Sequence, residues 1–202
     1  VERYNFSVFI KQLSGVAIPI SVSLENKKGD VYGETKFTTG STEWKKYTAT
    51  ITVNHSDDSV RLVLLAEGQG KRAICVVSVF PAKTFQNRPN GLRADMVQLL
   101  ADMKPGFLRF PGGCIVEGSE LSRRYQWKTT IGPIEDRKLI INRWNYEFKH
   151  RPTPDYFQSF GLGFFEFFQL CEDIGAQPLP ILNCGMACQF NTGQLVPLDQ
   201  ID

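Results

Sequence analysis

The feature that most constrains the fold of this chain is a change in apolar spacing between its two halves. In segment 18–25, which is typical of residues 1–85, every even-numbered position is apolar and the others are proline, serine or glutamate. Such alternation is typical of a strand with one buried face. Beyond residue 90 the apolar residues recur at intervals of three and four, as in helices. We therefore predict a β domain at 1–85 and an α/β domain at 86–202.

Residues 1–85 are expected to form an antiparallel β-sandwich or jelly roll. The predicted strands span 4–10, 18–25, 47–53, 60–66 and 73–80. The last two are almost continuously apolar, which is typical of inner strands. Turn-forming residues separate the strands, and we interpret Gly68–Lys71 as a hairpin turn because it lacks the spacing of a phosphate-binding loop. Several short strands at this spacing favour a sandwich.

The second half combines helices with short apolar strands. Apolar positions in segment 92–103 share one helical face, and Asn90 is the predicted N-cap. A second helix is predicted at 163–174, with Gly175 in the C′ position. The predicted strands span 107–110 and 179–182. Helix, strand, helix and strand in this order predict βα units of a parallel sheet.

Composition excludes several classes of protein. The formal net charge is +2 and 42% of the residues are hydrophobic, so the chain can bury a core and has no charge excess to hold a nucleic acid or a membrane surface. No run approaches the roughly 18 apolar residues that a membrane span needs. The chain opens at Val1 with neither a methionine nor a signal-peptide pattern, and we expect a piece of a longer protein. The oligomeric state stays open.

The cysteines do not suggest a metal site. The chain has five, at positions 75, 114, 171, 184 and 188, and none forms a CxxC pair. The two histidines, His55 and His150, lie far from the Cys184–Cys188 pair in sequence. Zinc needs a compact ligand set, so we expect reduced cysteines that are buried as small hydrophobic side chains, and no metal.

Candidate site residues cluster around the strand at 107–110 and the long aperiodic stretch after it. Loops of this length are usually functional or disordered, and its aromatic residues argue against disorder. Arg109 lies near the end of an apolar strand, so its charge is expected to need a buried partner, either in a site or in a structural ion pair. Cys114 follows the glycines of this turn and either contacts a ligand or packs.

Aromatic and acidic residues of the same stretch suggest sugar chemistry without defining it. Trp127 and Trp144 are candidate stacking platforms for a sugar ring or, alternatively, core residues. The possible acids are Glu117, Glu135, Asp136 and Glu166. Two carboxylates about 5 Å apart would suit a retaining glycosidase. No pattern in the sequence brings any two of them together, and solvated or ion-paired carboxylates remain the alternative.

Taken together, the motifs of the second half resemble a known enzyme family. They are Asn90–Arg93, Phe107–Cys114, Trp127–Lys128, Ile131–Pro133, Phe160–Gly161, Phe165–Phe167, Leu170–Glu172, Gly175–Ala176 and Asn183–Gly185. In this order they resemble the α-L-arabinofuranosidases of glycoside hydrolase family 51. The first half is similar to the carbohydrate-binding type of sandwich that some members carry near their N-terminus.

The resemblance implies a (β/α)8 barrel that uses a retaining mechanism. The strand at 107–110 would be the second barrel strand and the strand at 179–182 the third. The acid/base glutamate and the nucleophilic glutamate would both lie beyond residue 202. Since such a barrel needs roughly 200 residues or more, the chain is expected to hold only its first βα units and to be inactive alone.

The resemblance also implies roles for single residues. Arg109, Cys114 and Trp144 match positions at the arabinose site, with Glu117, Trp127, Glu166 and Asn183 as further candidates. The implied substrate is an arabinose-containing polysaccharide or oligosaccharide, cleaved without a metal or organic cofactor. Reduced cysteines favour the cell interior, whereas a polysaccharide substrate favours a secreted or periplasmic location, which is the location we prefer for the parent protein. The alternative function is that of a non-catalytic carbohydrate-binding module.

Overall fold

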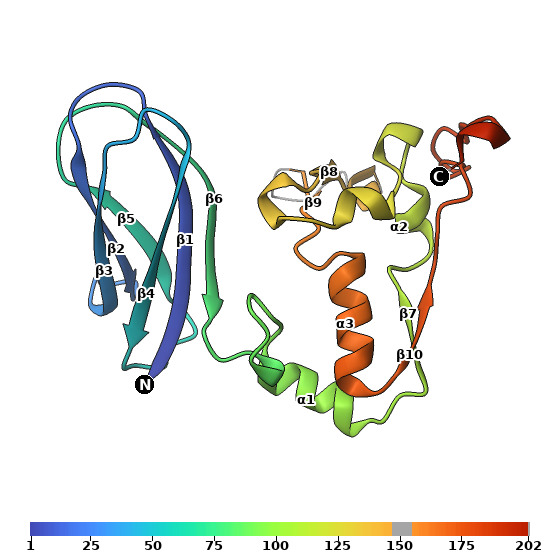
Figure 1. The fold of residues 1–202 in the computed structure, drawn as a ribbon, viewed down its shortest axis with the longest axis horizontal. Coiled ribbons are helices and arrows are strands. Elements are labelled where there is room, and N and C mark those ends of the chain that lie inside the picture. The colour runs from blue at the N-terminus through green and yellow to red at the C-terminus, as the bar shows by residue number, and fades with distance from the viewer. Residues whose placement is uncertain (147–154, 202) are drawn as a thin grey trace. The chain divides into compact units, whose positions relative to one another are not determined.

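A computed structural model describes residues 1–146 and 155–201, which fall into two compact units, Val1–Gln98 and Leu99–Asp202 (Figure 1). The strands of the first unit are β1 (Glu2–Gln12), β2 (Ile18–Glu25), β3 (Val31–Thr39), β4 (Lys45–Val53), β5 (Arg61–Ala66) and β6 (Arg72–Pro81). They form two antiparallel sheets in the orders β4-β1-β6 and β3-β2-β5. This unit is therefore β-rich, as the alternating sequence predicts.

The two sheets share one apolar core, which makes the unit a sandwich. Alternate residues of β1 and β4 face alternate residues of β2 across it, because successive side chains of a strand point to opposite faces. The buried core residues are Phe6, Val8, Ile10, Ile18, Ile20, Val22, Ile51 and Val53. The alternation read from the sequence thus identifies the inward-facing set correctly.

Three details of the predicted sandwich are wrong. Strand β3 was not predicted, because Gly33 and several threonines interrupt its apolar pattern. Strands β5 and β6 are edge strands rather than inner strands, and Leu65, Ile74 and Val77 are exposed on them. Segment Gly68–Lys71 is not a hairpin turn, because it joins strands that belong to different sheets.

The second unit is built around a short parallel sheet with irregular segments beside it. Its helices and strands are β7 (Phe107–Phe110), α2 (Cys114–Glu117), β8 (Ile140–Ile141), β9 (Phe157–Gln158), α3 (Phe164–Ile174) and β10 (Gln177–Pro180). Its single 3-10 turns are η2 (Leu121–Arg123), η3 (Trp127–Thr130), η4 (Ile134–Asp136), η5 (Arg143–Tyr146) and η6 (Leu198–Gln200), whereas η1 (Phe85–Asn87) lies in the first unit. Strands β7 and β10 pair in parallel, and α3 leads directly into β10 (Figure 1).

Strand β10 begins two residues before the predicted position. Helix α3 ends at Gly175, whose left-handed φ of 71° suits glycine, and the Gln177 amide already donates to the carbonyl of Gly106. At the other end of the strand, the Ile181 amide donates to the carbonyl of Phe110. Donors along one strand edge alternate, so Pro178 and Pro180 occupy positions whose missing N–H would point away from β7.

Helix α1 (Ala94–Asp102) forms where a helix is predicted, but its start and buried face differ from the prediction. It begins at Ala94, and Asn90 has a left-handed φ of 52° in the preceding turn rather than acting as the N-cap. Four residues of the predicted apolar face, Met96, Leu99, Leu100 and Met103, are 39% to 74% exposed, whereas Val97 is buried. Periodicity identifies an apolar face, but it does not show what covers that face.

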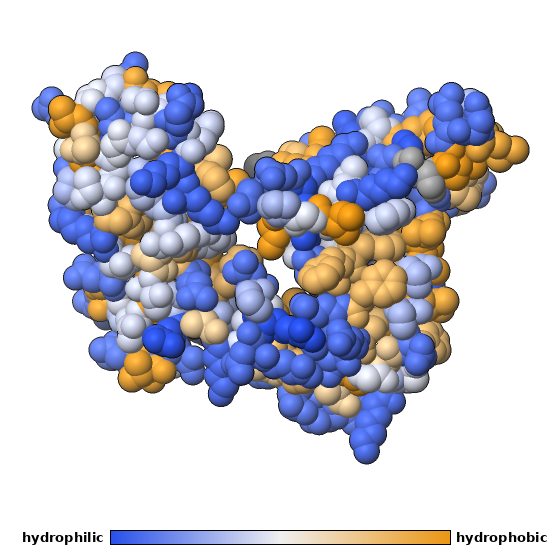
Figure 2. Space-filling view, viewed as in Figure 1, coloured by the Kyte–Doolittle hydropathy of each residue, from blue (hydrophilic) through white to orange (hydrophobic). Residues whose placement is uncertain are grey.

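Phe110 is the centre of the core of the second unit. Its ring stacks on Phe167 at a centroid distance of 4.7 Å and meets the rings of Phe164 and Phe168 edge-on. These three residues come from α3, so one aromatic cluster fixes the helix on the β7–β10 sheet. Phe168 is nevertheless 44% exposed and Phe165 60%, and Figure 2 shows hydrophobic surface over this helix.

Candidate functional site

The turn after β7 delivers the first group of candidate residues. Gly112 has a φ of 147°, and Gly113 is the N-cap of α2. Cys114 is the first residue of that helix and carries an exposed free thiol, and Glu117, at the other end of the helix, is half-buried. Both residues therefore lie just beyond the carboxyl end of a parallel strand, the usual location of functional residues in α/β folds.

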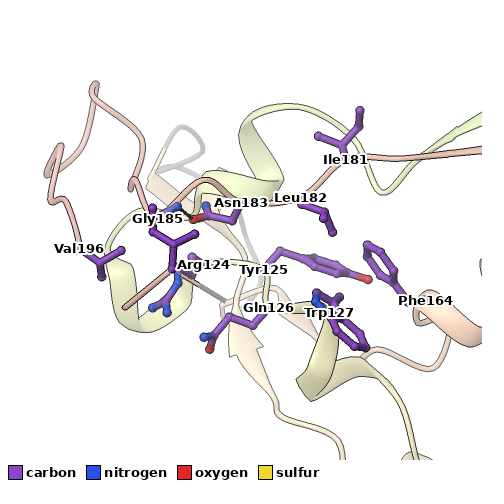
Figure 3. A pocket seen from close by; sticks show the side chains of 11 residues that line it. Arg124, Tyr125, Gln126, Trp127, Phe164, Ile181, Leu182, Asn183, Gly185 and Val196 are labelled. Carbon is purple, nitrogen blue, oxygen red and sulfur yellow. Dashed lines mark hydrogen bonds between the residues drawn. The ribbon is translucent and has the colours of Figure 1, made fainter. Parts of the chain in front are cut away.

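Asn183 ties the segment after β10 to the same turn. Its Nδ2 donates to the carbonyls of Val116 and Met186 at 2.8 and 3.0 Å. Its Oδ1 accepts the Gly185 amide at 2.7 Å (Figure 3). Both amide hydrogens are thus engaged by the backbone. The side chain holds α2 beside the segment that follows β10.

Trp144 comes to the same end of the sheet on η5, which lies against α2. Its amide donates to Oδ1 of the buried Asn142 at 2.9 Å, which fixes the backbone of η5. The guanidinium of Arg143 lies 4.7 Å from the centre of the Trp144 ring, and Trp144 remains 40% exposed. The fold therefore brings η5, α2 and the Asn183 turn together.

Arg109 stands apart from this group in one respect. The side chains of Leu108 and Phe110 pack into the core with α3, so the intervening Arg109 points to the opposite face of the sheet, where it is exposed beside Leu179. The buried carboxylate expected for it is not found in the described part of the chain. Exposure removes the desolvation argument that predicted such a partner.

Trp127 and Glu166 belong to the packing around the N-terminus of α3. Trp127 is half-buried, and its ring centroid lies 6.4 Å from that of Phe164. Glu166 accepts two bonds from Arg137 at 2.7 and 2.8 Å and the Gly163 amide at 2.9 Å. Burial alone would raise the pKa of Glu166, but these hydrogen bonds outweigh it and hold that pKa below its usual value.

A small pocket opens between segment 124–127 and the residues that follow β10 (Figure 3). Tyr125, Phe164 and Leu182 form much of its wall. Tyr125 is 4% exposed, and burial raises the pKa of its hydroxyl. The largely apolar wall, to which Asn183 also contributes, favours a role in packing.

The cysteines correct one expectation. Cys171 and Cys188 are buried, but Cys75, Cys114 and Cys184 are exposed, and all five thiols are free. Within residues 1–146 and 155–201 no three His, Cys, Asp or Glu side chains come close enough to hold a metal ion. No described helix is both long and apolar enough to cross a membrane.

Arg137 is the residue that sequence reasoning missed. Its side chain is 3% exposed, and it binds Glu166 together with two backbone carbonyls, those of Gly132 and Phe160. These partners lie up to 29 residues away along the chain. No local pattern marks such an arginine, because its partners become neighbours only in the folded protein.

Two family models match the chain, one on each half. A model described as "Alpha-L-arabinofuranosidase 1 domain" matches residues 99–202, just over half of the chain. A model described as "Carbohydrate binding domain" matches residues 1–70. The second match falls on the β-sandwich, and the first contains the β7–β10 sheet and its loops.

Individual relatives carry matching names. An extracellular exo-α-L-arabinofuranosidase of Streptomyces chartreusis is 37% identical over 90% of the chain, and α-L-arabinofuranosidase 1 of Arabidopsis thaliana is 33% identical over 98%. The solved structure of an arabinose-bound α-L-arabinofuranosidase of glycoside hydrolase family 51 covers 98% of the chain with a TM-score of 0.83 and 29% identity. The chain spans 22%, 28% and 31% of these three proteins, respectively.

Fold and comparisons together define a two-part sequence of the glycoside hydrolase class, in which a β-sandwich matched by the carbohydrate binding domain model precedes a segment matched by the arabinofuranosidase model. The chain belongs to the α-L-arabinofuranosidases of glycoside hydrolase family 51. The resemblance read from the sequence motifs is confirmed.

Proposed function

We propose that this chain is part of a retaining exo-glycosidase that releases terminal α-L-arabinofuranosyl groups from arabinan or arabinoxylan. The observation that carries the proposal is the convergence of α2, η5 and the Asn183 turn beyond the carboxyl ends of β7 and β10, in a chain of this family. Cys114, Glu117 and Trp144 would line the sugar site there. Asn183 would act mainly by holding the loops.

We further propose that residues 86–202 are the early part of a (β/α)8 barrel and residues 1–85 the inserted sandwich. The parallel β7–β10 pair with α3 on one face supports this arrangement. So do the exposed apolar residues on the opposite face of the sheet, Phe107 and Leu179, and those on α1. Further strands of a longer protein would cover these surfaces, and Arg109 would then point into the barrel.

In the proposed mechanism, one carboxylic acid protonates the leaving oxygen and a second carboxylate attacks the anomeric carbon, which yields a glycosyl-enzyme that water hydrolyses. We assign both carboxylates to parts of the protein outside this chain. The contacts of Glu166 support this assignment, because both of its oxygens accept hydrogen bonds from Arg137, one of them also accepts the Gly163 amide, and the side chain is thereby tied to the packing at the start of α3. No step here requires a metal or a cofactor.

The test compares the purified chain with the full-length protein on an aryl α-L-arabinofuranoside. We expect turnover by the full-length protein and none by residues 1–202 alone. Turnover by the isolated chain within tenfold of the parent would overturn the assignment of the catalytic carboxylates, and Glu117, Glu135 and Glu166 would then be the candidates. An inactive full-length protein would overturn the proposed activity itself.

A second candidate function applies to the sandwich. The carbohydrate-binding domain match over residues 1–70 favours a non-catalytic module that binds the polymer. Retention of the isolated chain on insoluble arabinoxylan, but not on cellulose, would support this function. It is compatible with hydrolysis by the rest of the protein.

A further inference from the structure

The side chain of Arg137, in the second unit, is almost fully buried, and each of its N–H groups is hydrogen-bonded. Its Nε donates to the carbonyl of Gly132 at 3.0 Å. Its Nη1 donates to Phe160 and Glu166, both at 2.8 Å, and its Nη2 donates to Gly132 at 2.8 Å and to Glu166 at 2.7 Å. One bond from Nε and two from each terminal nitrogen account for every N–H of the guanidinium.

The positions of these partners along the chain show what the cluster does. Phe160 lies 23 residues beyond Arg137, and Gly132 lies five residues before it. Glu166 also accepts the Gly163 amide, so the guanidinium is fixed to the first turn of α3. Arg137 therefore joins the two ends of the loop between residues 137 and 160 and anchors both ends to the helix.

Inside this loop, the segments that follow Arg137 and precede Phe160 pair with each other on the way to Trp144. Strand β8 pairs with β9, Ile140 opposite Gln158 and Ile141 opposite Phe157. The Asn142 amide then donates to the carbonyl of Tyr156 at 2.9 Å, and Oδ1 of the same Asn142 accepts the Trp144 amide. The β8–β9 pair and the hydrogen bonds of Asn142 thus lie between the Arg137 cluster and the backbone of Trp144.

We propose that Arg137, with Glu166, is a positioning residue for the sugar site. It holds the two ends of the loop between residues 137 and 160 together, so that η5 presents Trp144 beside α2. The inference rests on the proposed function, because it takes Trp144 as a contact of the arabinofuranosyl ring. Arg137 touches no substrate. Its fork matches the carboxylate of Glu166 bidentately, and a lysine ammonium cannot reproduce that geometry.

The expected signature is a change in KM rather than in kcat. A ring that packs equally on substrate and transition state provides uniform binding, whose loss raises KM and leaves kcat nearly unchanged. Loss of the Arg137 hydrogen bonds frees the two ends of the loop, and this lowers the fraction of molecules in which Trp144 is in place. A purely structural role for Arg137 would instead lower the amount of folded enzyme, which changes apparent kcat and not KM.

The experiment is a double-mutant cycle in the full-length enzyme with an aryl α-L-arabinofuranoside as substrate and arabinose as inhibitor. We expect Trp144→Ala and Arg137→Met each to raise KM and the arabinose Ki by about tenfold, with kcat within about threefold of wild type. The double variant should match Trp144→Ala, because coupled residues are not additive. Arg137→Lys should restore little.

The matched control is Arg93→Met, which removes another bidentate pair, between Arg93 and Asp95, in which both side chains are more than 60% exposed. It should leave KM and kcat unchanged. Where Arg137→Met fails to fold, Glu166→Gln replaces it, since glutamine keeps an acceptor for the Gly163 amide while the charge is lost.

The outcomes separate the two proposals. An effect of Trp144→Ala on KM, combined with an unchanged KM in a folded Arg137 or Glu166 variant, would overturn the positioning role alone. Effects that multiply in the double variant would overturn it as well. An unchanged KM in Trp144→Ala would overturn the proposed sugar contact, and the role of Arg137 would fall with it.

Discussion

The amide nitrogen Nδ2 of Asn183 donates a hydrogen bond to the carbonyl oxygen of Val116 at 2.8 Å, across 67 residues of sequence. Val116 lies within α2, between Cys114 and Glu117, and it is itself buried. One side chain thus joins the segments that follow the two parallel strands.

The first prediction follows from this bond. Asn183→Asp keeps the acceptor for Gly185 but places an anion against two carbonyl oxygens, whereas Asn183→Ala only removes the bonds. We expect the full-length enzyme to lose about 1–3 kcal/mol of local stability in the alanine variant and more in the aspartate variant. Protease protection of the segment after β10 measures the effect. Equal protection in all three proteins would contradict the prediction.

The second prediction concerns Arg109 in the full-length enzyme. If the barrel places the nucleophilic carboxylate beside this guanidinium, Arg109→Ala should lower kcat by about two orders of magnitude, which corresponds to about 3 kcal/mol. The acidic limb of the pH–rate profile should move to higher pH, because a carboxylate without its neighbouring cation has a higher pKa.

Arg109→Lys serves as the conservative control and should recover little activity if the contact is bidentate. A thermal melt shows whether each variant is folded. A folded Arg109→Ala variant with unchanged kcat and an unmoved acidic limb would leave Arg109 as a residue without a role in the reaction.

The third prediction concerns the approach of the first turn of α3 to η3. A Cβ on Gly163 would overlap the carbonyl oxygen of Thr130, whereas one on Gly161 would meet nothing within 4 Å. We therefore expect Gly163→Ala to destabilise the second unit by roughly 1–3 kcal/mol or more, since packed interiors relax poorly around added volume. Gly161→Ala should fall within about 0.5 kcal/mol of wild type. Comparable melting temperatures for the two variants would be evidence against this packing.

The fourth prediction concerns the aromatic centre at Phe110, which is 1% exposed and contacts three phenylalanines of α3. Phe110→Ala should cost about 3–5 kcal/mol through lost burial and a residual cavity, and Phe110→Leu clearly less. The exposed Phe165→Ala, on the same helix, is the control and should cost little. Denaturant unfolding followed by near-ultraviolet circular dichroism would report the order of the three variants.

The fifth prediction is a pH dependence at Glu166. Its pKa lies below the ordinary value of 4.5 in the folded protein, so the ionised form contributes stability that is fully present above about pH 4.5 and is lost as the pH falls through the folded-state pKa. The melting temperature of wild type should therefore exceed that of Glu166→Gln at pH 7, and the difference should shrink at pH values below 4.5. A difference that stays constant down to pH 3 would mean that the charge of Glu166 is irrelevant to stability.

Local sequence patterns predicted much of the fold. The alternation of segment 18–25 matches β2 residue for residue, and segment 107–110 matches β7. Gly175 ends α3 where its left-handed preference predicts. The positions of Cys114 and Glu117 after a parallel strand also follow from sequence, because a glycine turn after an apolar run is a local signal.

Which distant segments and side chains become neighbours in the folded protein could not be predicted in the same way. The apolar runs that form β5 and β6 look like inner strands, yet both lie at sheet edges, because strand order depends on pairing between distant segments. Likewise, Glu166 reads as a possible acid in the sequence, and only its contact with Arg137 shows that its oxygens are occupied.

By itself, the sequence determined most of the strands and longer helices, the inward faces of the sandwich and the family, because these depend on periodicity and on motifs contained within short segments. Only the tertiary structure decided that Asn183 holds α2, that η5 brings Trp144 beside α2 and that Arg137 joins the two ends of the loop between residues 137 and 160. The physical reason is that hydrogen bonds between side chains and distant backbone carbonyls leave no periodic trace in a sequence, since any exposed carbonyl can accept them.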